Sequence, residues 1–234
     1  MNKEKIQNFI LNTKTQFEKD IVEPISKEVA RSYIPHGLES EKQYQERVRL
    51  QVTSQIDQSN MRLMRATKIL KDKNLWGEEF SKTLEEVIDD ASKASQKAEQ
   101  GESLQAILKI DIETMIIFHG VALDFYEKGD LESTCDLYFL LTTLNGHIGD
   151  FWMGLALCQY KLHNLEGAAL AFMCWGALSA DDLTPYFHAA KCYVALGDKE
   201  MAQEALKIAM QRISECESLG FFKEEALSME QTLK

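Results

Sequence analysis

The chain has 234 residues, of which 45% are apolar, so it is long enough to form a hydrophobic core of its own. No apolar run approaches the roughly 20 residues that a membrane-spanning helix needs, and the first residues lack the apolar core and cleavage site of a signal peptide, which indicates a cytoplasmic protein without stable membrane insertion. The net charge of −11 is uneven, because residues 1–75 carry +4 and residues 76–234, with 12 Lys and Arg against 27 Asp and Glu, carry −15. So acidic a segment argues against nucleic acid as a partner.

The amino-acid usage predicts an all-α protein. Only three prolines and twelve glycines interrupt long stretches of helix-favouring residues, and no run of alternating β-branched residues suggests a sheet. The first predicted helix covers residues 2–34 and ends before "IPHGLES", where Pro35 and Gly37 break the chain. Its apolar residues recur at helical spacing: Ile6, Phe9, Ile10, Phe17, Ile21 and Val22.

The pattern over residues 38–74 predicts a second, more polar helix. Its apolar stripe is narrow, as in a seam between two helices: Tyr44, Val48, Val52, Ile56, Leu63 and Leu70. Such a helix packs on the rest of the protein, or on a second copy of the chain in a homodimer, or is only loosely attached, and the sequence leaves these alternatives open. We assign residues 1–76 to an N-terminal helical extension.

A change of composition at "KNLWGEEF" marks the start of the main body. A helix over residues 78–100 is predicted to follow, and Gly101 ends it because glycine favours the left-handed conformation at helix ends. Residues 77–114 therefore form leading helices, and residues 217–234 a C-terminal capping helix. The helices over 78–100 and 221–234 are expected to cover the two open ends of what lies between them.

Three segments between these helices align at a spacing of 34 residues: "FHGVALDFYEKGDLEST", "WMGLALCQYKLHNLEGA" and "YFHAAKCYVALGDKEMA". Each begins with an aromatic residue (Phe118, Trp152, Tyr186) and has a small residue four positions later (Ala122, Ala156, Ala190). The positions that follow are a helix end (Gly129, His163, Gly197), an N-cap (Asp130, Asn164, Asp198), a small residue (Thr134, Ala168, Ala202) and a large one (Tyr138, Phe172, Leu206).

This pattern and its period are those of the tetratricopeptide repeat (TPR). Each unit is a pair of antiparallel helices that cross closely at the small residues, while the aromatic and the large residues fill the space between the helices. We therefore predict three TPR units over residues 115–216, which is the minimum number for a stable stack.

The pair His188 and Cys192 raises the question of metal or nucleophile chemistry, because residues four apart share a helix face. No second pair of ligands stands at motif spacing, and zinc normally takes four. The five cysteines have no disulfide spacing and are interpreted as free thiols. The sequence has no phosphate loop, metalloprotease motif or catalytic triad. We therefore predict a binding protein that is not an enzyme and that has no cofactor and no metal.

Stacked helix pairs curl, and the first helix of each pair lines the concave side. Within these helices the repeat places a largely apolar set of side chains inward, which we call the inner-wall residues: Ile116, His119, Leu123, Tyr126, Met153, Leu157, Tyr160, Phe187, Lys191 and Val194. An exposed apolar groove of this kind is typical of a peptide-binding surface. The alternative is that the N-terminal extension of the chain itself fills the groove.

Three short motifs distinguish this chain from TPR proteins in general. They are "G-x-[ST]-[LI]" at Gly101–Leu104, "FW-x-G-L" at the start of the second repeat, and "FHAAKC" followed by "GD". On these motifs residues 80–215 resemble the LcrH/SycD family, the class II type III secretion chaperones. The long N-terminal extension resembles that of members from chlamydia-like bacteria.

The resemblance implies a cytoplasmic bacterial chaperone whose partners are the translocator proteins of a type III secretion system. These clients carry membrane-inserting segments, and the family holds a short extended client segment in the TPR groove without using a nucleotide. Tyr126 matches a groove tyrosine of the family, whereas His119 and Leu123 stand where aromatic residues are common. The alternative is a generic TPR adaptor for another protein's peptide, but an adaptor for acidic tails would need more groove cations than Lys191.

Overall fold

The computed structural model describes residues 41–82 and 100–232, and the chain divides into two compact units, Met1–Met61 and Arg62–Lys234. The helix predicted over residues 2–34, the break after it and most of the helix predicted over 78–100 lie outside the described residues. Within the described ranges the chain is helical and contains no strand, which confirms the predicted all-α fold.

Helix α3 (Glu41–Asp72) falls within the stretch 38–74 where the sequence predicts it. In the first unit its Val48 is buried, whereas Leu50 and Met61 are exposed. From Arg62 onwards α3 belongs to the second unit, where Ala66 and Leu70 are completely buried.

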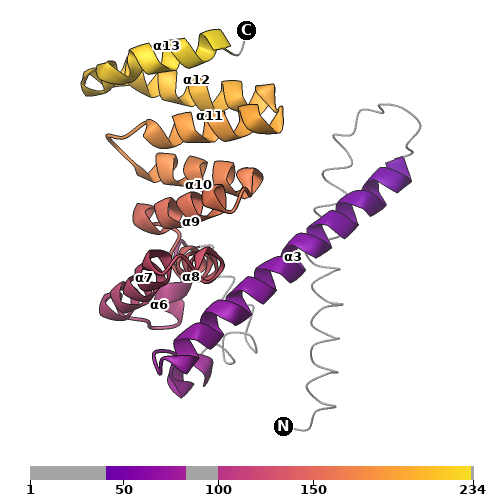
Figure 1. The fold of residues 1–234 in the computed structure, drawn as a ribbon, viewed down its shortest axis with the longest axis vertical. Helices are drawn as coiled ribbons and strands as arrows, with labels where there is room; N and C mark the ends of the chain where they lie inside the picture. Colours follow the sequence, from indigo (N-terminus) through magenta and orange to yellow (C-terminus); the bar gives the residue numbers. More distant parts are fainter. Residues whose placement is uncertain (1–40, 83–99, 233–234) are drawn as a thin grey trace. The chain divides into compact units, whose positions relative to one another are not determined.

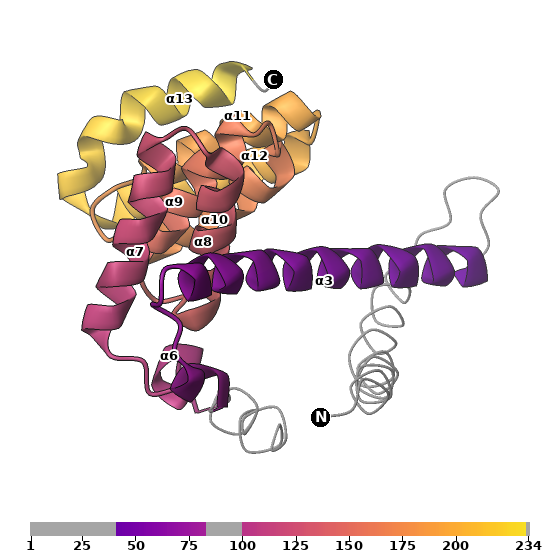
Figure 2. The same cartoon turned by 60° about the horizontal axis from the view of Figure 1, so that its bottom comes forward.

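The second unit is built on consecutive helical hairpins. After the short α6 (Leu104–Ile107) come α7 (Ile112–Glu127) with α8 (Leu131–Leu144), α9 (Gly149–Lys161) with α10 (Leu165–Leu178), and α11 (Thr184–Leu196) with α12 (Lys199–Glu215). Figure 1 shows α9 to α12 stacked in chain order beyond the α7–α8 hairpin. The 3₁₀ helix η2 (Glu217–Phe222) and α13 (Lys223–Thr232) follow, and α13 lies at the end of the stack beyond α12 (Figure 1). In the turned view of Figure 2, α13 runs along the upper edge of the stack.

The turns inside the three hairpins have the predicted chemistry. Gly129, His163 and Gly197 have φ values of 77°, 59° and 77°, the left-handed conformation that ends a helix. The residue after each one caps the next helix, since Asp130, Asn164 and Asp198 accept hydrogen bonds from backbone N–H groups three positions on. Local sequence therefore fixes where each first helix ends and each second helix begins.

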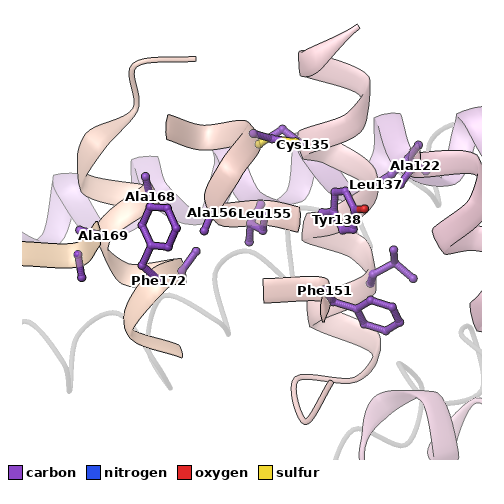
Figure 3. Packing of buried hydrophobic residues seen from close by; sticks show 14 of the residues in the cluster. Ala122, Cys135, Leu137, Tyr138, Phe151, Leu155, Ala156, Ala168, Ala169 and Phe172 are labelled. Carbon is purple, nitrogen blue, oxygen red and sulfur yellow. The ribbon is translucent and has the colours of Figure 1, made fainter. Parts of the chain in front are cut away.

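The repeat positions also form the core. Ala122, Ala156 and Ala190 are fully buried, and the large residues Tyr138 and Phe172 belong to the same core. Figure 3 shows Ala122, Ala156, Tyr138 and Phe172 in this core. Gly154 is required for this packing, because a Cβ atom there would lie 2.3 Å from the ring of Tyr138. The Tyr138 ring thus occupies the space that any larger side chain at position 154 of α9 would need.

The first repeat is covered by residues that the sequence assigns to the N-terminal extension. The ring of Trp76 stacks on that of Phe118, with centroids 6.0 Å apart, and Phe80 meets Trp76 edge-on. On α8 the buried carboxylate of Asp136 accepts hydrogen bonds of 2.5 and 2.8 Å from the guanidinium of Arg65. The last turns of α3 are therefore anchored to the TPR body, a contact that no repeat pattern predicts.

Candidate functional site

The inner-wall residues lie on the first helices of the three hairpins, α7, α9 and α11. Six are exposed, with Ile116 reaching 63%: Ile116, Leu123, Leu157, Tyr160, Lys191 and Val194. Three are half-buried: His119, Tyr126 and Met153. The structure thus leaves apolar side chains of consecutive first helices open to water at equivalent repeat positions.

Tyr126 is joined to the next hairpin by a residue that the sequence reasoning missed. Lys161, at the end of α9, donates a hydrogen bond of 2.6 Å to the Tyr126 hydroxyl and lies 4.4 Å from the centroid of its ring. This contact fixes the phenol and brings the ends of α7 and α9 together. It also places a second cation, besides Lys191, at the inner-wall residues. The sequence signal for this contact is that Lys161 directly follows Tyr160, and Tyr160 occupies the same repeat position as Tyr126.

His119 is held by the core beneath it. Its Nε2 lies 3.1 Å from the Tyr138 hydroxyl, and its ring meets those of Tyr138 and Phe151 edge-on, with both centroids 5.6 Å away. Burial raises the pKa of the Tyr138 hydroxyl well above its usual value, so the phenol keeps its proton and remains a hydrogen-bonding partner. His119 is therefore oriented by a fixed contact, with only part of its ring open to a ligand.

Phe187 differs from the other inner-wall residues because it is only 1% exposed. The ring of Phe222, in η2, lies 5.8 Å from the ring of Phe187, and Lys191 Nζ lies 3.7 Å from a carboxylate oxygen of Glu225 in α13. Leu219 and Ala226, on either side of Phe222, are buried as well. The predicted C-terminal cap thus covers not only the end of the stack but also part of the inner-wall set.

His188 and Cys192 both serve packing. The His188 ring stacks on Phe172 of the preceding hairpin at 5.0 Å, and burial, together with Lys191, lowers the pKa of its imidazole. Cys192 is buried, and burial raises the pKa of its thiol, which keeps it in the unreactive protonated form. Residues 41–82 and 100–232 contain no group of three His, Cys, Asp or Glu side chains that could hold a metal ion.

A second apolar feature is lined by none of the inner-wall residues. A depression of about 230 Å³ is formed by α8, α9 and α10, with Phe139, Trp152 and Leu170 among its lining residues. Leu170 is 62% exposed, as much as Ile116. Because Leu170 lies on a second helix, away from the inner-wall positions, it offers a matched control for tests of those residues.

No protein-family model matches the sequence, but several solved structures resemble this chain. A T3SS complex from Aeromonas hydrophila matches 61% of this chain and 95% of its own at 18% identity with a TM-score of 0.51, which shows a common fold. The CopN–Scc3 complex matches 55% and 75% at 23% identity with a TM-score of 0.48. The type III secretion chaperone SycD of Yersinia enterocolitica, in complex with a peptide of the translocator YopD, matches 53% and 95% at 20% identity with a TM-score of 0.44.

None of the helices in the described ranges combines the length and the apolar character of a membrane span.

Proposed function

We propose that this chain is a cytoplasmic chaperone of a bacterial type III secretion system and that it binds translocator proteins through its inner-wall residues. The observation that carries the proposal is the series of exposed apolar side chains on consecutive first helices, namely Leu123 on α7 and Leu157 and Tyr160 on α9. Apolar side chains repeated in this way are typical of a surface that a partner covers.

The chemistry of the surface indicates an extended apolar client segment. Leucine, isoleucine and tyrosine side chains offer contacts to apolar side chains of a partner, and tyrosine is a frequent binding hot spot. The two cations nearby are already engaged, Lys161 with the Tyr126 hydroxyl and Lys191 with Glu225. The exposed apolar side chains of the inner wall outnumber these two cations, so an apolar segment fits the surface better than an acidic one.

Two further findings support the proposal. The motifs at Gly101–Leu104, at the start of the second repeat and in "FHAAKC" resemble those of the translocator chaperones. The chain also shares its fold with a component of a T3SS complex. Translocators carry segments that enter membranes, and such segments aggregate if they are left uncovered before secretion. A chaperone that covers one of them needs binding energy but no catalytic group and no cofactor.

The test is a pull-down of the tagged full chain from the native bacterium, with the Leu157→Ala and Tyr160→Ala variants beside it. We expect two co-purifying proteins that contain long apolar segments, and each variant should weaken their binding by about 1–3 kcal/mol, as for hot-spot residues. The control is Leu170→Ala, which removes an even more exposed apolar side chain outside the inner wall. Partners without such segments would favour the generic TPR adaptor, and equal losses in all three variants would remove the inner wall as the binding surface.

A further inference from the structure

The C-terminal segment, residues 217–232, contacts the third repeat at its inner-wall positions. Phe222 covers Phe187, and Glu225 faces Lys191 on the next turn of α11. Two different elements of the segment, η2 and α13, thus meet the same face of the same helix. Val194, one turn further along α11, stays exposed.

The equivalent positions of the other repeats show what this contact changes. His119 on α7 and Met153 on α9 occupy the same repeat position as Phe187, and both are half-buried. Phe187 is 1% exposed, so the third repeat differs from the other two at this position. The difference agrees with the position of the Phe222 ring, which packs where the first two repeats leave their side chain partly open.

The segment is held firmly enough to remain in place. Leu219 before Phe222 and Ala226 after it are both buried, whereas the Lys191–Glu225 pair is about half exposed on both sides and contributes little. Anchors on both sides make Phe222 a fixed part of the surface. Phe221 beside it is 73% exposed and does not share this role.

We propose that the C-terminal segment is an end stop for the client surface. Phe222 closes the surface at the third repeat, so a bound client segment lies along the first helices α7 and α9 and does not contact Phe187. This inference rests on the proposed function. It adds that the C-terminal segment limits how far along the first helices a client segment can bind. Removing the Phe222 ring opens a further apolar position at Phe187.

The first experiment needs no client and uses the apolar dye bis-ANS as the probe. The full chain is compared with Phe222→Ala and with Phe221→Ala, which removes the exposed neighbouring ring. We expect a rise in dye fluorescence for Phe222→Ala alone, and we expect the additional substitution Phe187→Ala to abolish that rise. Circular dichroism must show equal helix content, so that the dye does not report unfolding. No rise in a folded Phe222→Ala variant would mean that Phe222 does not close the position, and the end stop would be lost.

The second experiment measures hydrogen exchange on the complex as it is purified from the native bacterium. We expect the client to slow exchange in α7 and α9 and to leave α11 unchanged, while in Phe222→Ala the slowing extends into α11. Slower exchange in α11 of the wild-type complex would overturn the end stop and leave the proposed function intact. If none of the three helices were affected, the proposed binding surface would fail, and the dye experiment would still decide whether Phe222 closes the third repeat.

Discussion

Arg65 of α3 and Asp136 of α8 form a two-pronged ion pair in which the carboxylate is only 2% exposed. Arg62, one turn earlier, adds a second cation 3.8 Å from the same carboxylate and donates a hydrogen bond to Cys135. A buried carboxylate requires such partners, since removing one partner leaves an uncompensated charge in the protein. The end of α3 is therefore part of the charge balance of the TPR body.

The first prediction concerns this ion pair. Arg65→Ala should lower the free energy of unfolding by about 1.5–3 kcal/mol, because the carboxylate of Asp136 loses its two strongest hydrogen bonds while the more distant Arg62 compensates only in part. Lys68→Ala is the control, as it removes an exposed ion pair with Asp72 on the same helix and should change stability by less than about 1 kcal/mol. The measurement is urea unfolding. Equal effects of the two substitutions would show that the Arg65–Asp136 ion pair stabilises the fold no more than an exposed pair does.

The second prediction compares two glycines at the same repeat position. Gly154→Ala places a methyl group 2.3 Å from the Tyr138 ring and should destabilise the chain by about 1–3 kcal/mol through overpacking. Gly120→Ala in the first repeat meets nothing within 4 Å and should stabilise it by roughly 0.5–1 kcal/mol, because alanine favours the helix. Thermal unfolding of both variants distinguishes the two effects. Destabilisation by Gly120→Ala, or tolerance of Gly154→Ala, would mean that the helix pairs cross differently.

The repeat could be predicted from the sequence because its signals are local and recur at one spacing. Turn residues such as Gly197 and small residues such as Ala156 act at their own positions, and the period of 34 residues relates the three hairpins to one another. The contacts that the sequence did not predict join residues far apart in the chain. Arg65 and Asp136 are an example, because each alone resembles an ordinary surface charge and only the fold brings them together.

The inner wall shows the same division. The repeat pattern predicts that the inner-wall residues lie on the first helices. These residues are exposed wherever no other element packs against them. The buried ring of Phe187 packs against that of Phe222, which lies after the last repeat and has no assigned position in the pattern. Capping segments of repeat proteins are atypical by necessity, since their outer face meets water, and so a repeat pattern carries no information about what they cover.

The third prediction concerns pH. Because burial and the nearby Lys191 ammonium lower the pKa of His188 in the folded chain, against smaller opposite effects of Glu225 and Asp182, the unfolded chain takes up this proton more readily. The stability that the neutral His188 imidazole contributes to the folded chain is fully present above the unfolded pKa of about 6.5. It is lost as the pH falls toward the lowered folded pKa. Stability should therefore fall between about pH 7.5 and pH 5.5 by more in the wild type than in His188→Gln.

The control for this measurement is His147→Gln, which makes the same substitution at an exposed histidine. The comparison between variants cancels the titration of the carboxylates, which all three proteins share. Denaturant midpoints at the two pH values provide the readout, and an unchanged pH dependence in His188→Gln would show that another group is responsible.

The last prediction tests where the TPR body begins. The boundary that the sequence suggests after residue 76 leaves Leu70 and Trp76 outside the body, although both are buried in its core. Among the described residues, the buried members of this core begin at Ala66, and the partly buried Leu63 packs against them. A chain that starts at Ser54 retains the last turns of α3 and two further turns before Arg62, so it should fold and keep its unfolding transition. A chain that starts at Gly77 loses Ala66, Leu70 and Trp76, and it uncovers Phe118 and the carboxylate of Asp136.

Burial of each large apolar side chain contributes about 1.5–3 kcal/mol, so these losses together reach the order of 5 kcal/mol or more. That amount is comparable to the whole stability of many domains, which is about 5–15 kcal/mol. We therefore expect the Gly77 chain to melt far below the Ser54 chain or to be unfolded, as measured by circular dichroism during heating. If the two chains melted together, Trp76 and the end of α3 would be an attachment to a body that is complete without them, and the boundary after residue 76 would stand.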